Sequence, residues 1–182
     1  MALTLRPPGP DDEAACLAAQ GEFESFPFLL HWEPGLEWSR YLDHLEGLRR
    51  RTRVPEGPIP EGPVPEGPIP ENPVPSTFLL AEVDGALVGR ASVRFSLNDF
   101  LAARGGHIGY GVRPAFRRRG YATAILQQAV AIARAEGVGR ILVVCDDDNE
   151  GSARVIERCG GVLESVVTPG EGVTPFRRYW ID

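Results

Sequence analysis

Residues 107–136 read HIGYGVRPAFRRRGYATAILQQAVAIARAE. Apolar residues alternate with glycine between positions 108 and 112, which is the period of a β-strand. Pro114 ends that strand, because proline cannot donate to a ladder. Residues 122–135 are rich in alanine, with larger apolar residues at helical spacing, so they predict a long helix. A basic turn that contains Gly120 joins the predicted strand to the predicted helix.

This turn has the composition of an anion-binding site. It brings backbone N–H groups and the start of a helix to one point, and the unpaired first-turn donors and the helix dipole both favour a negative charge there. Gly120 permits close approach of a ligand to the backbone, and Ala122 keeps the following position small. The alternative is a solvated basic turn that merely caps the helix. The strand before it and the helix after it favour phosphate binding.

The composition is that of a globular domain. The chain has 182 residues, of which 43% are hydrophobic and 24% are charged. Its net charge of −6 argues against a general nucleic-acid binder, despite two runs of three arginines. Cys16, Cys145 and Cys159 form no CxxC pair, which predicts reduced thiols in a cytoplasmic protein. We expect no secretion signal and no membrane segment, since the N-terminus lacks a basic and an apolar region.

The remaining elements follow from periodicity and turn residues. Strands are predicted at 3–6, 77–83, 86–95, 140–145, 162–167 and 176–181, and helices at 11–24, 36–50 and 152–158. Asp84-Gly85 predicts a tight hairpin turn, and residues 96–106 are expected to form a connection. Residues 55–74 repeat as PEGPI, PEGPV, PEGPI and PENPV. So much proline excludes helix and sheet, and an inert insert at 55–75 is favoured over a docking ligand for an aromatic groove.

Arg117, Gly120 and Ala122 fit the pattern [Q/R]-x-x-G-x-[G/A]. In this the sequence resembles the GNAT acetyltransferases, whose pyrophosphate loop has that pattern after a strand ending in Val-x-Pro. The predicted order β-α-α-β-β-β-α-β-α-β-β resembles the GNAT order over the whole chain apart from the repeat. The nearest resemblance is to a group of predicted bacterial acetyltransferases of unassigned substrate. It implies one α/β (α+β) domain, 1–182, with a mixed central sheet of about seven strands flanked by about four helices.

The resemblance also implies acetyl-CoA as co-substrate. A second GNAT motif, N-x-x-[A/S]-x-x-x-Y-x-x-x-G, is matched at Asn149, Ser152 and Gly160. The residues that this likeness assigns to cofactor binding are Tyr110, Gly111, Val112, Arg117, Arg118, Arg119, Gly120, Tyr121, Ala122, Thr123, Asn149 and Ser152.

The same motif departs from the family at the general acid. Ile156 stands where a tyrosine often protonates the leaving thiolate, and isoleucine has no proton to donate. Tyr110 and Tyr179 are the alternative donors. His107 holds a strand position at which related groups often carry a glutamate that deprotonates the amine, and imidazole suits a base at neutral pH. A merely structural histidine is the alternative. The expected activity is acetyl transfer to a primary amine, and the competing reading is a non-catalytic acyl-CoA-binding or sensing module.

Two further features of the sequence bear on ligand binding. Asp146, Asp147 and Asp148 suggest a metal site, but a charged strand end with a helix cap is favoured, so no metal is expected. The aromatic residues of the N-terminal segment are candidates for substrate contact, although a core role is favoured: Phe26, Trp32, Trp38 and Tyr41. The expected partner is a small-molecule or peptide amine, with neither nucleic acid nor membrane, and a homodimer is left open.

Overall fold

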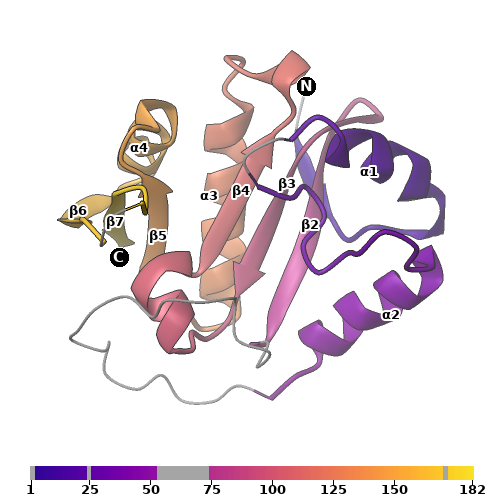
Figure 1. Ribbon diagram of the computed structural model, residues 1–182, viewed down its shortest axis with the longest axis horizontal. Helices are drawn as coiled ribbons and strands as arrows, with labels where there is room; N and C mark the ends of the chain where they lie inside the picture. Colours follow the sequence, from indigo (N-terminus) through magenta and orange to yellow (C-terminus); the bar gives the residue numbers. More distant parts are fainter. Residues whose placement is uncertain (1–2, 24–25, 53–73, 170–171) are drawn as a thin grey trace.

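The computed structural model describes residues 3–23, 26–52, 74–169 and 172–182, and its elements surround one sheet (Figure 1). The strands are β1 (Thr4–Arg6), β2 (Ser76–Val83), β3 (Ala86–Arg94), β4 (Ile108–Val112), β5 (Ile141–Asp146), β6 (Val162–Val167) and β7 (Phe176–Ile181). The α-helices are α1 (Glu13–Gln20), α2 (Trp38–Arg49), α3 (Tyr121–Ala135) and α4 (Glu150–Arg158). Short 3₁₀ turns lie at Pro10–Asp12 and Pro114–Phe116, and a π-helical turn at Leu101–Gly105.

The sheet is mixed and seven-stranded, as expected, with the order β1-β2-β3-β4-β5-β7-β6. Every neighbouring pair is antiparallel except β4 and β5, which run parallel. Within the described residues these two strands share one register pair, Ile108 with Val143. Beyond that pair they diverge towards their C-terminal ends (Figure 1). The sheet is therefore split in its middle, at the end of the strand that leads into the basic turn.

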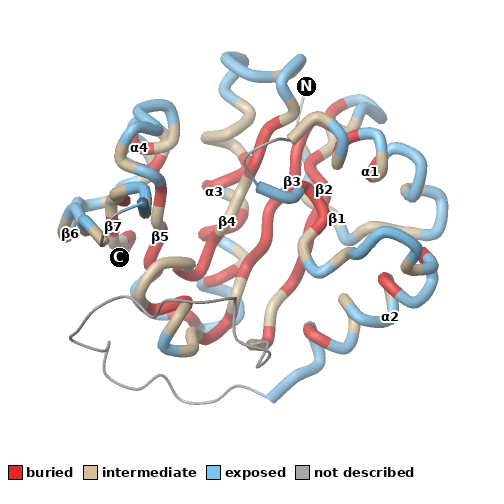
Figure 2. Tube along the Cα trace, viewed as in Figure 1, coloured by how far each residue is buried: buried red, intermediate tan, exposed pale blue. Residues whose placement is uncertain are grey.

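The two faces of the sheet carry separate cores. Helix α3 buries its apolar stripe, with Ile125 and Leu126 fully buried, against β3 and β4. Helices α1 and α2 cover the other face, where Phe28 and Tyr41 pack against β2. Figure 2 shows the buried strands between these layers. This arrangement follows from strand periodicity, because successive side chains point to opposite faces.

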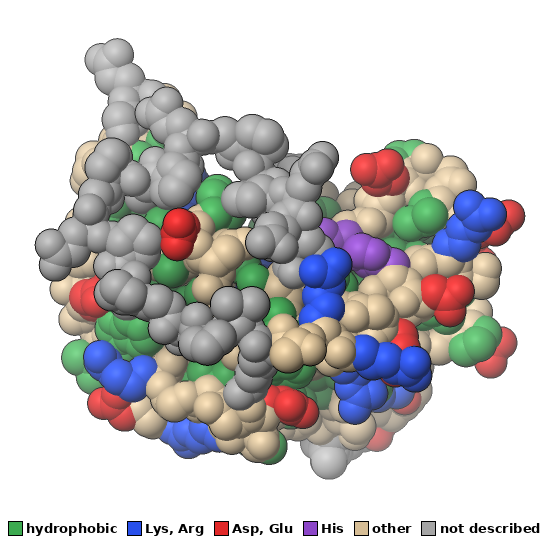
Figure 3. Space-filling model, turned by 90° about the horizontal axis from the view of Figure 1, so that it is seen from below, with side chains coloured by type: hydrophobic (Ala, Val, Ile, Leu, Met, Phe, Trp, Pro, Cys, Tyr) green, Lys and Arg blue, Asp and Glu red, His purple; other side chains and the backbone are tan. Residues whose placement is uncertain are grey.

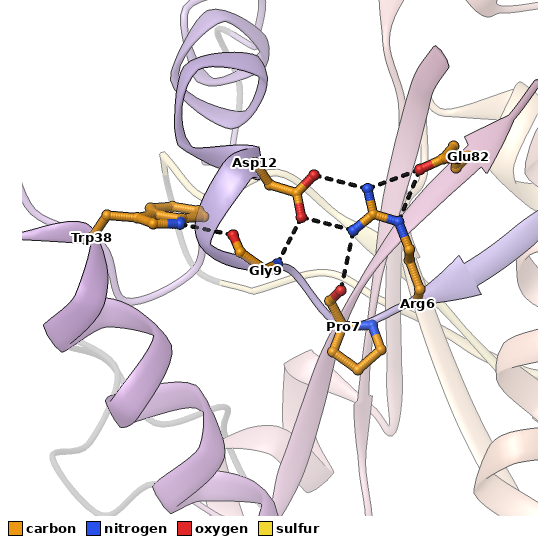
Figure 4. A network of polar contacts seen from close by, with 6 residues as sticks. All are labelled: Arg6, Pro7, Gly9, Asp12, Trp38 and Glu82. Atoms are coloured by element: carbon orange, nitrogen blue, oxygen red, sulfur yellow. Dashed lines mark hydrogen bonds and ion pairs between the residues drawn. The ribbon is translucent and has the colours of Figure 1, made fainter. Parts of the chain in front are cut away.

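A polar network fixes the N-terminal helices to the edge of the sheet (Figure 4). The guanidinium of Arg6 donates to both carboxylate oxygens of Asp12, at 2.7 and 2.8 Å, and to Glu82 at 2.8 Å. Asp12 also accepts from the N–H of Gly9 at 2.6 Å, and the carbonyl of Gly9 accepts from the indole N–H of Trp38 at 2.9 Å. Strand β1, the start of α1 and the start of α2 are thereby connected.

Some expected boundaries were wrong. The first helix ends at Gln20 rather than near residue 24, because the chain turns at Gly21, whose N–H donates to Leu17, and the Gln20 side chain accepts from the N–H of Leu29 at 2.7 Å. The expected connection at 96–106 contains the π-helical turn. The repeat lies outside the described residues apart from Val74 and Pro75, so its inert role stays a prediction. In the described ranges, none of the helices has the length and apolarity needed to cross a bilayer.

Candidate functional site

The split in the sheet exposes backbone polar groups along one edge of β4. The N–H of Arg94 donates to the carbonyl of His107 at 2.8 Å, so the odd-numbered residues of β4, Gly111 included, direct their backbone groups towards β3. By alternation, Tyr110 and Val112 direct theirs towards β5, beyond the register pair that joins the two strands. This edge can hydrogen-bond an extended ligand as an additional strand would.

The basic turn closes directly onto this edge. Arg117 donates from Nε to the carbonyl of Val112 at 3.2 Å. Arg118 has a φ of 62° and Gly120 a φ of 82°, which turn the chain into α3. The first helical hydrogen bond runs from Ala124 to Gly120. In the part of the chain that the structure describes, no group accepts from the N–H groups of residues 121–123, so these donors are open to a ligand.

The surroundings of these donors are cationic and unobstructed. Arg117, Arg118 and Arg119 are exposed beside them. A Cβ built on Gly120 would meet no atom within 4 Å. The unpaired N–H groups, the helix dipole and the arginines therefore act together on one open volume. An anion such as a phosphate is the group that this arrangement can hold.

Helix α4 contributes the opposite wall of the split. The hydroxyls of Tyr110 and Ser152 are 2.7 Å apart, which joins β4 to the first turn of α4. Asn149 caps that helix, since its side-chain oxygen accepts from the N–H of Ser152 at 3.0 Å. Burial raises the pKa of Tyr110 above its ordinary value, so its phenol stays protonated at neutral pH. Asn149 and Ser152 of the second motif thus lie next to Tyr110.

The other positions considered for the general acid lie elsewhere. Ile156 is fully buried in the core beneath α4. The hydroxyl of Tyr179 donates to Glu157 at 3.2 Å, and the residue is 1% exposed. Of the candidate donors, Tyr110 alone is placed at the edge of the split among the residues described.

His107 lies at the closed end of the split. It is fully buried, and its Nδ1 accepts from the N–H of Leu142 at 2.9 Å. Its own N–H donates to the carbonyl of Leu142 at 2.7 Å, so the residue clamps β4 to the start of β5. This placement gives His107 a structural task and lends no support to the base role, which stays an untested prediction.

The aspartate run after β5 serves structural contacts. Asp147 pairs with the guanidinium of Arg177 at 2.6 Å. Among the described residues, no group of three or more His, Cys, Asp or Glu side chains is placed to hold a metal ion. Cys16, Cys145 and Cys159 are free thiols, and burial raises the pKa of Cys145 to about 11.

The face of the sheet under α1 and α2 holds residues that the sequence analysis missed. Arg90, Ser92 and Arg94 alternate along β3 and point to this face, opposite Ala91 and Val93 in the α3 core. Their polar side chains at every second position of a strand could have indicated from the sequence that this face is polar. Of the aromatic candidates, Trp38 and Tyr41 are core, bonded to the carbonyls of Gly9 and Leu30, and Trp32 packs beside them. Phe26 is 39% exposed and lies over Gly111.

Comparison with known proteins agrees with this geometry. Residues 42–161 match the family model described as "Acetyltransferase (GNAT) family". This segment covers β2 to α4, and so includes both the split and the basic turn.

Solved structures share the same fold. RimL, a ribosomal L7/L12 alpha-N-protein acetyltransferase in complex with coenzyme A, has a TM-score of 0.66 at 17% identity over 99% of this chain and 93% of its own. Mycobacterium smegmatis RimJ, in complex with CoA-disulfide, has a TM-score of 0.67 at 18% identity over 98% of this chain and 81% of its own. An N-acetyltransferase from Staphylococcus aureus Mu50 has a TM-score of 0.65 at 14% identity over 100% of this chain and 99% of its own.

Proposed function

Because the chain belongs to the acetyltransferase (GNAT) family, we propose that it transfers an acetyl group from acetyl-CoA to a primary amine. The observation that carries the proposal is the set of open N–H groups at residues 121–123, placed beside the split between β4 and β5. A pyrophosphate at the start of α3 and an extended pantetheine along the edge of β4 would meet both sets of donors.

In the proposed reaction the neutral amine attacks the thioester carbonyl carbon, and the C–S bond then breaks. The backbone N–H groups of Tyr110 and Val112 face the split and would stabilise the charge that develops on the carbonyl oxygen. Holding the amine and the thioester together contributes roughly 7–11 kcal/mol to lowering the barrier. The proton that the amine loses passes to water or to a base that the acceptor site supplies.

Tyr110 is the proposed general acid. Its hydroxyl lies at the first turn of α4, 2.7 Å from the hydroxyl of Ser152, and its raised pKa keeps it protonated over the working range. Donation of that proton to the sulfur would release coenzyme A as a thiol, and Ser152 could then relay a proton from water to the phenolate, which restores both hydroxyls. Tyr110 would thus do the work of the tyrosine that Ile156 replaces.

A non-catalytic acyl-CoA-binding module is the second candidate. Ile156 favours it, since the motif position of the acid is occupied by a fully buried apolar side chain. Such a module would bind acetyl-CoA through the same loop and release no thiol. We therefore propose acetyl transfer as the main function and non-catalytic acyl-CoA binding as the alternative.

Two measurements on the same preparation test the proposal. Calorimetry with coenzyme A measures binding to the loop, and release of free thiol from acetyl-CoA measures transfer to a panel of primary amines. Binding together with amine-dependent thiol release is the expected result. Binding without thiol release for any amine would favour the sensing module, and an absence of binding would overturn both readings.

A cytoplasmic location suits a reaction that consumes acetyl-CoA, and cell fractionation can test it.

A further inference from the structure

Three polar side chains converge over a glycine on the face of the sheet that α1 and α2 cover. Around the position where a Cβ on Gly109 would lie, Ser92 Oγ is at 3.1 Å, Arg90 Nη1 at 3.6 Å and Arg94 Nη1 at 4.0 Å. Strand pairing explains the convergence, because Ser92 is the register partner of Gly109 and the arginines flank it two residues away on either side. Two guanidinium groups and a hydroxyl therefore aim at one point above β4.

Arg90 is a buried cation with no counter-ion among the described residues. It is 4% exposed, its Nη2 donates to the carbonyl of Pro27 at 3.2 Å, and its guanidinium lies 5.3 Å from the centre of the Phe26 ring. In the described part of the chain, no group accepts a hydrogen bond from its Nε. Desolvation and the neighbouring Arg94 lower the pKa of Arg90 to about 10, so the side chain is still charged at neutral pH.

Arg94 is bonded to neutral groups. Its Nη1 donates to the carbonyls of Gly105 and Gly106, at 3.4 and 3.0 Å. In the described ranges no carboxylate forms an ion pair with Arg90 or Arg94. Two neighbouring cations that are partly desolvated and unpaired destabilise a fold. Stability alone therefore does not account for this pair.

Strand β4 contributes no side chain beside the cluster, and the open space next to it is small. Gly109 and Gly111 leave the floor of β4 without side chains at this face. A cavity of about 20 Å³, the space of about one water-sized group, adjoins the cluster on the side of Ser92 and Arg94; His31 lines it as well, whereas Arg90 and Gly109 do not. In the view from below, histidine side chains lie beside blue side chains at the surface (Figure 3); the chain contains no lysine, so every blue residue there is an arginine.

The position relates this cluster to the proposed chemistry. Gly109 directly precedes Tyr110, whose backbone faces the split. The cluster therefore lies on β3, the strand paired with β4, and faces a glycine one residue from Tyr110, on the face of the sheet that α1 and α2 cover. An anionic group bound by these three side chains would therefore be part of a substrate that approaches the thioester from the α1/α2 face of the sheet.

We propose that the acceptor is an amine that also carries a carboxylate, as an amino acid does, and that Arg90, Ser92 and Arg94 bind that carboxylate. This inference rests on the acetyltransferase function proposed above. The two guanidinium groups and the hydroxyl donate to the carboxylate oxygens, which neutralises the unpaired cations and fixes the amine beside the thioester. A carboxylate is favoured over a phosphate because the space is small.

Matched acceptors test the substrate class. With saturating acetyl-CoA, thiol release is measured for α-amino acids, for β-alanine, for the carboxamide of each, and for aminomethylphosphonate against glycine. Acids are expected to exceed their carboxamides in kcat/KM by at least ~100-fold, since a site built for a charged hydrogen-bonding group discriminates strongly against its absence. Carboxamides or polyamines that react as well as the acids would overturn the inference. A preference for the phosphonate over glycine would overturn the choice of carboxylate.

Variants connect the preference to these residues. Arg90→Met keeps an apolar stem and should remove the preference for acids, whereas Arg90→Lys should retain part of it. Arg40→Met is the matched control, because Arg40 is an exposed arginine of α2 whose side chain is 75% exposed. Arg94→Met repeats the test if Arg90→Met does not fold. Affinity for coenzyme A, measured by calorimetry, should be unchanged in every folded variant.

A binding measurement separates this inference from the proposed function. Sodium acetate should raise the melting temperature of the wild type by about 2 °C or more over sodium chloride at the same ionic strength. Arg90→Met should lose this effect and Arg40→Met should keep it. A wild type that binds coenzyme A but gains nothing from acetate would overturn the carboxylate site and leave the acetyltransferase proposal standing. Failure to bind coenzyme A would remove the acetyltransferase proposal itself.

Discussion

Substitution of Gly120 by valine probes the proposed cofactor loop most directly. The residue has a φ of 82° and introduces α3, and a Cβ there would meet no atom within 4 Å. The Cβ of the new side chain would therefore lie in open space. The side chain would occupy the volume in front of the N–H groups of residues 121–123, where the pyrophosphate is proposed to bind.

The size of the effect follows from those donors. A hydrogen bond to a charged group is worth about 1.5–3 kcal/mol. If the branched side chain displaces the pyrophosphate from one or two of the three N–H groups, the loss is about 2.7 kcal/mol, which corresponds to a ~100-fold weaker Kd for coenzyme A. A side chain at positive φ also costs folding stability, about 1–2 kcal/mol, but that strain is present in the free and the bound protein alike.

Calorimetric titration with coenzyme A measures the loss, and Gly35→Val controls for the strain. Gly35 has a φ of 91°, a Cβ there also meets nothing within 4 Å, and it precedes α2 on the opposite face from α3. Both variants should lose similar stability, and Gly120→Val alone should lose affinity. Arg117→Ala should weaken binding by less than ~10-fold, because it is one exposed cation among three and is screened by salt. Wild-type affinity in a folded Gly120→Val protein would refute the cofactor assignment.

Four further predictions address other parts of the molecule. His107→Ala should lower the melting temperature, because the Leu142 N–H loses its acceptor, and should leave the pH–rate profile unchanged. His107→Asn should recover stability. If His107→Ala instead removes the limb of the pH–rate profile near neutral pH, His107 is the base. Tyr110→Phe should lower kcat by at least ~10²-fold with unchanged affinity for coenzyme A, and the wild type should show no basic limb below about pH 9; an unaltered kcat would exclude it as the acid. The hydrogen bond with Arg6 is the main reason why the pKa of Asp12 is lowered, so the Asp12 carboxylate stabilises the fold above the unfolded pKa of about 3.9, and this contribution is lost as the pH falls through the folded pKa. The Asp12→Asn variant should therefore unfold at a lower urea concentration than the wild type at pH 7 and at the same concentration near pH 2. Equal stability of the two proteins at pH 7 would contradict the network. Deletion of residues 55–74 should leave the melting temperature and the affinity for coenzyme A nearly unchanged, since loop-closure cost varies slowly with length; a large loss of either would show that the repeat packs on the protein.

Local patterns explain why most of the fold was predictable. The strand, turn and helix at 107–136 are encoded by neighbours in sequence, through alternation, a proline stop, a glycine and helical spacing. The π-helical turn at Leu101–Gly105 was missed because its carbonyls are satisfied by Arg178, more than seventy residues away. The first helix was extended too far because its end depends on a bond between Gln20 and Leu29 across the following turn.

The site was less predictable because its contacts cross between strands. The residue type of His107 fits a base, but its burial and its bond to Leu142 belong to the packed β4–β5 junction. Arg90 and Arg94 read as ordinary polar positions of a strand. Their convergence depends on the register that sets Ser92 opposite Gly109, and on the absence of a side chain there. Pairing register is a long-range property that a single sequence specifies only weakly.

The divided sheet has a consequence for cooperativity of unfolding. Strands β1 to β4 form one antiparallel unit and β5 to β7 another, and within the described residues the two strands β4 and β5 are joined by the register pair of Ile108 with Val143 and the adjacent hydrogen bonds between His107 and Leu142. Each unit can therefore exchange its amide protons through its own partial opening, although the packing of α3 on α4 also connects them. A molecule that bridges β4 and α4 would couple the two units. Protection of β5–β7 amides in hydrogen exchange should then rise with coenzyme A more than that of the β2–β3 hairpin.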